Sequence, residues 1–186
     1  RRERPQKGRQ RQFHQFGVEA FGSKYAEQEA ETIAVAWHIL SKCGLTENTT
    51  LLLNSIGTSE CRYAYREALK HFLEPHLNDL SEASRKRLNH NPLRILDTKN
   101  EKERSLLKDA PEIADYYSKD DKKHLEEVKD FLSAMDIPFT INSRLVRGLD
   151  YYTKTVFEIT SSELGSQDAL LGGGRYDDLV ENLGGK

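Results

Sequence analysis

The sequence predicts an α+β fold in which an antiparallel sheet with flanking helices is interrupted by an inserted α-helical domain. Alternating or short apolar segments, which are typical of strands, occur towards both ends of the chain. Between them, from Thr58 to about Met135, the sequence is rich in charged residues, poor in β-branched residues and periodic in the manner of helices. We therefore expect residues 1–57 and 139–186 to form the core around the sheet, with residues 58–138 as the insertion.

The first core segment is expected to contain a strand, a helix and a second strand. From Gln12 to Phe21, polar and apolar residues alternate with period two, which predicts a strand. A helix is predicted from about Lys24 to Cys43, because apolar residues recur at helical spacing and Gly44 supplies a C-terminal stop. The apolar segment from Thr50 to Gly57 predicts a short buried strand that ends in a turn.

The inserted region is expected to contain two amphipathic helices. Ser118 and Asp121 form a capping pair at the start of the second helix. Prolines punctuate the region, as is typical of a small domain built from short helices. The apolar stripes comprise Leu69, Phe72, Leu73 and Leu77 in the first helix, and Leu125, Val128, Phe131, Leu132 and Met135 in the second.

Strand patterns return after Pro138. Three consecutive segments, residues 139–145, 147–152 and 153–159, are rich in β-branched and aromatic residues and predict strands. Residues 172–185 begin with three glycines and continue with apolar residues at helical spacing, which predicts a glycine turn that leads into a short helix.

Composition limits the classes of function. Residues 1–12 hold six basic residues and one acidic residue, whereas the remainder holds 22 basic and 29 acidic residues. This distribution indicates a local anion site and not a general affinity for nucleic acid. Cys43 and Cys61 are the only cysteines, without a CxxC or paired-histidine spacing, so we expect no zinc site and a reducing cytosol. No segment resembles a signal peptide or a membrane span.

The first candidate site lies in the basic N-terminal segment. If residues 12–21 form a strand, Gln15 and Glu19 share a face with Arg9 and Arg11. An amide and a carboxylate below an arginine cluster suit a zwitterion that is joined to a phosphate. Surface charge is the ordinary alternative for such a run of arginines.

Two further segments carry residues suited to binding. In residues 145–158, Gly148 permits a sharp turn, so that Arg147 and the Tyr151–Tyr152 pair can reach one cavity. The alternative is a β-bulge that places a tyrosine in the core and the arginine at its rim. The glycines of residues 172–177 are more often a tight turn than a phosphate cradle.

Taken in order, these segments resemble the bacterial-type histidyl-tRNA synthetases, a family of class II aminoacyl-tRNA synthetases. Residues 1–22 resemble the family's motif 2, residues 145–158 its first histidine-specific motif, and residues 170–185 its second. The resemblance covers essentially the whole chain and implies the class II catalytic core. No segment of the chain resembles the family's motif 1, motif 3 or anticodon-binding domain. We therefore expect both ends to be cuts in a longer protein, and the piece alone to be weak or inactive.

The resemblance implies a role for each matching residue. Arg1 and Arg147 would be catalytic, because two fixed guanidiniums can neutralise charge that builds on the α-phosphate of ATP. Gln6 would lie where the acceptor end of the tRNA approaches. The ATP-binding set would comprise Arg1, Glu3 and Arg9, and the histidine-binding set Gln15, Glu19, Arg147, Tyr151, Tyr152 and Tyr176. ATP would enter as its Mg²⁺ complex, and no zinc or tightly bound organic cofactor is expected.

The implied function is ATP-dependent activation of histidine and its transfer to tRNA(His), by a cytoplasmic homodimer that needs no membrane. A histidine-binding, synthetase-like regulatory subunit of ATP phosphoribosyltransferase is the alternative, although the presence of Arg1, Glu3 and Arg9 favours the enzyme. A third hypothesis is an RNA-binding module built on Arg85, Lys86 and Arg87 of the insertion. A charge run on a helix is more often a solvated face.

Overall fold

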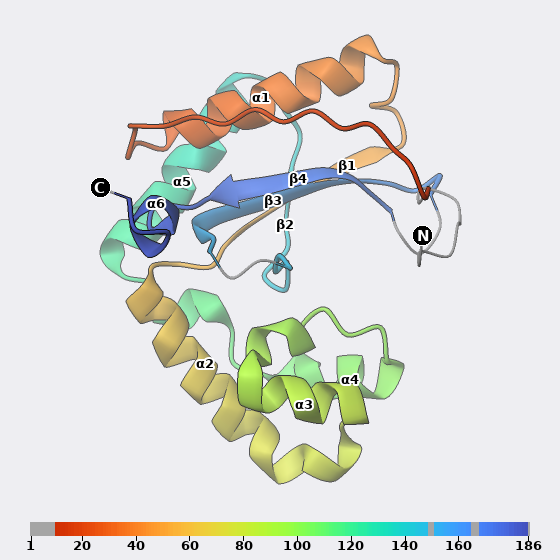
Figure 1. Ribbon diagram of the computed structural model, residues 1–186, viewed down its shortest axis with the longest axis vertical. Helices are drawn as coiled ribbons and strands as arrows, with labels where there is room; N and C mark the ends of the chain where they lie inside the picture. Colours follow the sequence, from red (N-terminus) through yellow and green to blue (C-terminus); the bar gives the residue numbers. More distant parts are fainter. Residues whose placement is uncertain (1–9, 149–150, 165–167, 186) are drawn as a thin grey trace. The chain divides into compact units, whose positions relative to one another are not determined.

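The computed structural model describes residues 10–148, 151–164 and 168–185, and it confirms an α+β fold (Figure 1). Short 3-10 helices occur at Glu74–Asp79, Pro92–Ile95, Leu107–Asp109 and Ile113–Tyr116. The α-helices are α1 (Glu27–Lys42), α2 (Ser59–Leu73), α3 (Glu82–His90), α4 (Glu101–Leu106), α5 (Lys119–Ala134) and α6 (Leu179–Asn182). The strands are β1 (Thr49–Ser55), β2 (Thr140–Ile141), β3 (Thr153–Ser161) and β4 (Ala169–Arg175).

Among the described residues, the strands form one sheet in the order β2-β1-β3-β4. β3 is antiparallel to β1, because Ser162 N–H donates to the Asn48 carbonyl near one end while Ile56 N–H donates to the Lys154 carbonyl near the other. β2, however, is parallel to β1, with Leu52 opposite Thr140. The expectation of an antiparallel sheet is therefore wrong for this pair. A long helical crossover separates β1 from β2, and such a crossover permits parallel pairing.

The described chain divides into two compact units. The first holds α1, most of α5, β2 and parts of β1, β3 and β4. The second holds α2, α3, α4, α6, the irregular residues 142–148 and 151–152, and the remaining strand residues. The division of the sequence into a core and an inserted domain of residues 58–138 stays a prediction.

In the first unit, α1 and α5 pack on the sheet around one apolar core. α1 begins at Glu27, later than predicted, and its predicted stop at Gly44 is confirmed. Gly44 has φ +69°, and the N–H of Leu45 donates to the carbonyl of Leu40 at 2.9 Å, as in a Schellman motif. The core comprises Ala26, Ala30, Ile33, Ala34, Leu40, Leu51, Leu53, Val128, Leu132, Ile137, Phe157 and Ile159.

Residues 12–21, for which a strand is predicted, form no strand. Phe13 and Phe16, which would lie on opposite faces of such a strand, are both 67% exposed, so neither face of this segment is covered. A strand needs a neighbour for its backbone N–H and carbonyl groups, and none of the described strands pairs with this segment. The alternation would place Gln15 and Glu19 on one face of a strand, but this segment belongs to no sheet among the described residues.

The segments after Pro138 also differ from the prediction. Strand β2 ends at Ile141, because the side-chain amide of Asn54 donates to the carbonyls of Ser143 and Leu145 at 3.3 and 3.0 Å. A side chain thus satisfies groups that a neighbouring strand would otherwise satisfy. The described part of residues 147–152 forms a bend and a turn that lead into β3.

The glycines at 172–174 lie within β4 and not in a turn, although the short helix expected after them, α6, is confirmed. A Cβ on Gly173 would lie 2.9 Å from Cζ of Phe157, and one on Gly174 would lie 2.5 Å from the carbonyl oxygen of Thr155. Both distances are too short for a side chain. The glycines therefore allow β4 to approach the backbone and the rings next to it closely.

The helices of the second unit are fixed by side-chain caps and a buried carboxylate. Ser118 and Asp121 form the predicted capping pair, with Asp121 N–H bound to Ser118 Oγ at 3.0 Å and Ser118 Oγ–H bound to Asp121 Oδ2 at 2.8 Å. The predicted apolar stripe of α2 is confirmed at Leu69 and Leu73, which are buried, whereas Leu77 lies beyond the helix and is exposed.

Glu103 is 1% exposed and joins three segments of the second unit. Its carboxylate accepts the backbone N–H of Ser81 at 2.6 Å, the hydroxyl of Ser84 at 2.9 Å and the hydroxyl of Thr98. Burial raises the pKa of Glu103, but the hydrogen bonds from Thr98, Ser81 and Ser84 outweigh it and hold the pKa below its usual value.

We expect Glu103→Gln to lower the free energy of unfolding by about 1–3 kcal/mol at pH 7, because an amide NH₂ replaces an oxygen that accepts hydrogen bonds. The pKa is lower in the folded chain, so the carboxylate stabilises the fold above its unfolded pKa of about 4.3. This contribution is lost as the pH falls through the folded value. Urea titrations of the variant and the parent should therefore give a difference in the free energy of unfolding that is smaller in acid than at pH 7.

Glu67→Gln, on the exposed surface of α2, is the control and should stay within about 0.5 kcal/mol of the parent. A Glu103→Gln variant as stable as the parent at pH 7 would show that the carboxylate does not stabilise this unit.

Candidate functional site

The predicted site residues fall into three groups in the structure. Arg1, Glu3, Gln6 and Arg9 lie outside the described residues. Gln15 and Glu19 lie in the exposed segment of the first unit that precedes α1. The second unit holds the remaining group, Arg147, Tyr151, Tyr152 and Tyr176, and these four residues define the geometry of the candidate site.

Three of the predicted tyrosines form one aromatic cluster. The rings of Tyr151 and Tyr152 have centroids 4.7 Å apart, and the ring of Tyr176 meets that of Tyr151 edge-on at 6.0 Å. Tyr152 immediately precedes β3 and Tyr176 immediately follows β4. The first pair is tilted and the second is edge-to-face, and edge-to-face contacts stabilise aromatic clusters beyond simple burial.

The pairing of β3 with β4 brings these tyrosines together. Thr153 Oγ–H donates to the carboxylate of Asp177 at 3.2 Å, and Asp177 N–H lies 3.1 Å from Thr153 Oγ. This contact aligns the start of β3 with the end of β4. The absence of a side chain at Gly174, which lies against the ring of Tyr152, leaves room for it.

Arg147 lies beside the cluster and interacts with Tyr152. Tyr152 is 7% exposed, and burial raises the pKa of its hydroxyl to about 12. A hydrogen bond with Tyr151 also raises this pKa, whereas the charge and hydrogen bond of Arg147 lower it. The hydroxyl of Tyr152 is therefore protonated at neutral pH. The arrangement combines an aromatic wall, phenolic groups and one guanidinium.

Arg62 of α2 holds the loop that carries Tyr151 and Tyr152. Its guanidinium donates to the carbonyl of Tyr152 and to Ser59 Oγ at 3.1 Å, and Ser59 Oγ–H donates to Asp178 at 3.2 Å. The first turn of α2 thus ties together both segments of the tyrosine cluster. Arg62 is not among the site residues predicted from the sequence; its place in the first turn of a helix that follows a strand is the available signal.

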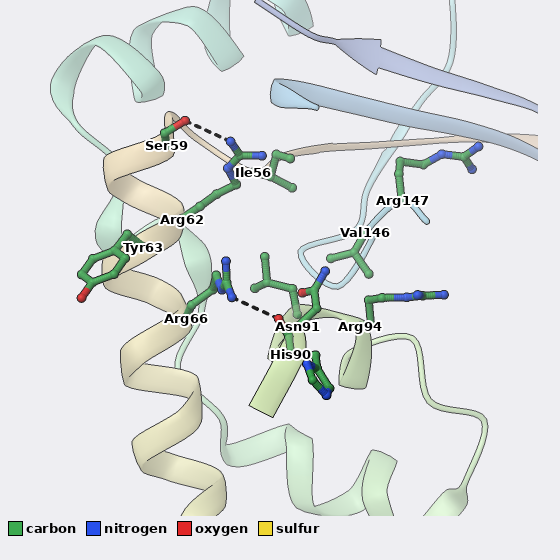
Figure 2. Close-up of a pocket in the computed structure, with 11 residues that line it drawn as sticks. Ile56, Ser59, Arg62, Tyr63, Arg66, His90, Asn91, Arg94, Val146 and Arg147 are labelled. Atoms are coloured by element: carbon green, nitrogen blue, oxygen red, sulfur yellow. Dashed lines mark hydrogen bonds between the residues drawn. The ribbon is translucent and has the colours of Figure 1, made fainter. Parts of the chain in front are cut away.

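Arg62 also belongs to a basic pocket of about 280 Å³ in the second unit (Figure 2). None of the lining residues is an aspartate or a glutamate. They are Ile56, Ser59, Arg62, Tyr63, Arg66, His90, Asn91, Leu93, Arg94, Val146 and Arg147. We call this set the arginine pocket. The site residues predicted from the sequence include none of Arg62, Arg66 and Arg94, although Arg62 and Arg66 stand four residues apart and hence on one helix face.

The charge run of the insertion, Arg85, Lys86 and Arg87, has other partners. Lys86 pairs with Glu82 at 2.7 Å on the exposed face of α3. Arg85 donates to the carbonyls of Leu77 and Leu80, and Arg87 donates to the carbonyl of Arg94. These contacts hold α3 to its surroundings. The hypothesis of an RNA-binding module built on this run stays a prediction.

No cluster of three or more His, Cys, Asp or Glu side chains that could hold a metal ion occurs among the described residues. None of the described helices combines the length and the apolar character that a membrane span requires.

Comparison with known proteins gives one consistent result. Residues 1–186 match the model of the family described as histidyl-tRNA synthetase. The histidine–tRNA ligase of Wolbachia pipientis wMel is 50% identical over 186 residues, which cover all of this chain and 46% of that protein. The histidine–tRNA ligase of Protochlamydia amoebophila (strain UWE25) is 50% identical over 185 residues, or 43% of its length. The chain thus spans less than half the length of these curated relatives.

Solved structures agree with the sequence relatives. The apo histidyl-tRNA synthetase of S. aureus matches with a TM-score of 0.68 and 35% identity, over 89% of this chain and 40% of that one. A Bacillus halodurans protein described as an ATP phosphoribosyltransferase regulatory subunit/histidyl-tRNA synthetase matches with a TM-score of 0.55 and 23% identity, over 88% of this chain and 46% of that one. The second likeness concerns the fold alone.

We expect Arg62→Ala to lower the free energy of unfolding by about 1–3 kcal/mol, because the carbonyl of Tyr152 loses a charged donor. Amide exchange in the segment that carries Tyr151 and Tyr152 should also accelerate. Urea titration and hydrogen exchange measure these two effects.

Arg94→Ala is the matched control, since it removes a guanidinium from the same pocket. Its side chain has no hydrogen bond or ion pair with the described residues, so it should leave both quantities close to those of the parent. Equal exchange in the parent and in Arg62→Ala would contradict the role of Arg62 in holding this loop.

Proposed function

The chain belongs to the histidyl-tRNA synthetase family, and on this premise we propose that its protein activates histidine with ATP and transfers the histidyl group to tRNA(His). The observation that carries the proposal is the placement of Arg147 beside the cluster of Tyr151, Tyr152 and Tyr176. Relatives at 50% identity that bear the name histidine–tRNA ligase support it.

In the first step, a carboxylate oxygen of histidine attacks the α-phosphorus of ATP. A bond forms between this oxygen and phosphorus, the bond from phosphorus to the bridging oxygen breaks, and pyrophosphate leaves with Mg²⁺. Negative charge builds on the non-bridging oxygens of the α-phosphate. Arg147 and Arg1 are proposed to neutralise it, because fixed guanidiniums stabilise such charge without reorganisation.

In the second step, a hydroxyl at the 3′ end of the tRNA attacks the carbonyl carbon of the adenylate, and AMP leaves. Gln6 is proposed to contact the acceptor end during this transfer. Glu3 and Arg9 are proposed to bind the adenine and the outer phosphates of ATP. The assignment of Gln6, Glu3 and Arg9 rests on their place in the motif.

Recognition of histidine is proposed to depend on the tyrosine cluster. Tyr151, Tyr152 and Tyr176 offer aromatic faces and phenolic groups to an imidazole, while Arg147 attracts the carboxylate. Gln15 and Glu19 are proposed to bind the amino group and the second ring nitrogen. An amino acid without ring nitrogens would leave buried polar groups unpaired, and such mispairing discriminates strongly between substrates.

The cofactors, the oligomeric state and the cellular location are also proposals. ATP would act as its Mg²⁺ complex, and the protein would need no zinc and no tightly bound organic cofactor. It would work as a homodimer in the cytoplasm, with tRNA(His) as its macromolecular substrate.

The regulatory-subunit alternative shares the fold, as the Bacillus halodurans protein shows. Its identity to this chain is 23%, against 50% for the ligases. Such a subunit would bind histidine without charging tRNA. Aminoacylation of tRNA(His) by the full-length protein is therefore the measurement that separates the two.

We expect Arg147→Ala to reduce histidine-dependent ATP–pyrophosphate exchange by the full-length protein about 100- to 1,000-fold, the effect of removing one preorganised donor from a transition state. Lys86→Ala, which removes an equal charge that is paired with Glu82 at the surface, is the control and should retain the parent's rate.

Exchange that requires histidine but survives Arg147→Ala would overturn the role of this arginine. A parent protein without histidine-dependent exchange would overturn the proposed activity itself.

A further inference from the structure

Two arginines bind Tyr152, one at its main chain and one at its side chain. The main-chain carbonyl accepts a hydrogen bond from the guanidinium of Arg62, in the first turn of α2. The side-chain hydroxyl shares a hydrogen bond with Arg147. The proposed function assigns Arg147 to the carboxylate of histidine and to the α-phosphate, whereas it assigns no role to Arg62.

We propose that Arg62 is a positioning residue for the histidine site, which holds the main chain of Tyr152 so that the tyrosine cluster is formed before histidine binds. Arg62 touches neither histidine nor ATP, and it acts through Tyr151 and Tyr152. The inference deepens the proposed function and rests on it, because it takes the tyrosine cluster as the site of histidine. It makes the first turn of α2 part of the apparatus that recognises the amino acid.

The backbone that follows Tyr152 is the first step. Lys154 has a φ of +47°, an unfavourable left-handed conformation for a residue with a side chain. Its N–H donates to the carbonyl of Gly57 at 2.8 Å, and its carbonyl accepts the N–H of Ile56 at 2.7 Å. These two bonds fix the start of β3 against the residues that precede α2. A side chain in the first turn of α2 therefore stands at a fixed place beside Tyr152.

The orientation of Arg62 is the second step. Its guanidinium also donates to Ser59 Oγ at 3.1 Å (Figure 2), and Ser59 Oγ–H donates to Asp178 at 3.2 Å. A guanidinium is a rigid planar fork, so bonds to two acceptors define its position. Asp178 stands two residues after Tyr176. One chain of hydrogen bonds thus runs from the carbonyl of Tyr152 to the segment that carries the third tyrosine.

The exchange of partners by Arg147 is the third step. When the carboxylate of histidine attracts Arg147, the hydroxyl of Tyr152 loses the hydrogen bond of this arginine. The bond from Arg62 to the main-chain carbonyl is independent of the ligand, so it keeps the loop in place during the exchange. Without Arg62, only a fraction of the molecules would hold the rings in the binding geometry. The affinity for histidine would then fall by that fraction.

The test compares the full-length parent with Arg62→Ala, Arg62→Lys and the matched control Arg66→Ala. Arg66 stands one turn further along α2 and donates to the carbonyl of His90 at 3.3 Å. The control therefore removes an equal charge from the same helix and leaves the tyrosine loop untouched. Calorimetry measures the Kd of histidine without ATP. ATP–pyrophosphate exchange measures the KM of histidine, the KM of ATP and kcat.

We expect Arg62→Ala to raise the Kd and the KM of histidine about tenfold, as for a binding geometry that is populated about one-tenth of the time. The KM of ATP and kcat should stay within about threefold of the parent, because histidine restores the loop once it is bound. Arg62→Lys keeps a charged donor and should stay within about threefold in Kd. Arg66→Ala should match the parent in every constant. A merely structural role would lower the folded fraction, and with it the apparent kcat, without changing the KM of histidine.

Two results would overturn the inference. One is a Kd and a KM of histidine in Arg62→Ala that equal those of the parent. The other is an equal loss of affinity in Arg66→Ala, which would assign the effect to the charge of α2 and not to the contact with Tyr152. If Arg62→Ala does not fold, Ser59→Ala removes one acceptor of Arg62 and the link to Asp178. Its Kd should rise about threefold, and an unchanged Kd would likewise overturn the inference.

Failure of the proposed function has a different signature. A parent that binds histidine but shows no histidine-dependent exchange would overturn the proposed activity, while calorimetry on the variants would still decide the role of Arg62. A parent that binds no histidine would overturn both.

Discussion

The candidate site depends on the close approach of β4 to β3 at Gly173 and Gly174. A side chain at either position would collide with the ring of Phe157 or with the carbonyl of Thr155. This approach sets the register in which Thr153 meets Asp177. That register places Tyr176, at the end of one strand, against Tyr151, before the start of the other. The recognition chemistry that we propose therefore follows from two absent side chains.

The loop that carries Arg147 is irregular, and side chains from neighbouring elements hold it. Asn54, at the end of β1, binds the carbonyls of Ser143 and Leu145, and Arg62 binds that of Tyr152. Irregular backbone with these bonds can keep one conformation without pairing in the sheet. A site built on such a loop can present an arginine and a tyrosine in directions that a regular strand would not allow. Arg62 also lines the arginine pocket, so one side chain serves the tyrosine loop and the pocket.

Features that depend on neighbouring residues were predictable from the sequence. The stop of α1 at Gly44 and the Ser118–Asp121 cap need only a few adjacent residues, and both are confirmed. The prediction of a strand at residues 12–21 is wrong, because an alternating pattern defines two faces but does not provide a neighbouring strand to pair with. The prediction of a turn at the glycines of β4 is wrong, because a glycine suits a backbone with positive φ and a close packing contact equally. The positions of Phe157 and of the Thr155 carbonyl, which the sequence does not reveal, distinguish the two cases.

The arginines of the pocket were likewise not predictable from the sequence. Arg85, Lys86 and Arg87 are contiguous and therefore conspicuous, but consecutive residues on a helix point in different directions. Arg66 and Arg94 come from separate helices, and the fold of the helical region brings them to one pocket. The likeness of three segments to one family identified the tyrosine cluster, whereas the pocket needed the structure.

The most direct test of the central claim is a crystal structure of the full-length protein with histidine bound. The expected result is an imidazole against the rings of Tyr151 and Tyr176, with the carboxylate of histidine at the guanidinium of Arg147. An imidazole bound away from these tyrosines, with Arg147 turned from the ligand, would contradict the account.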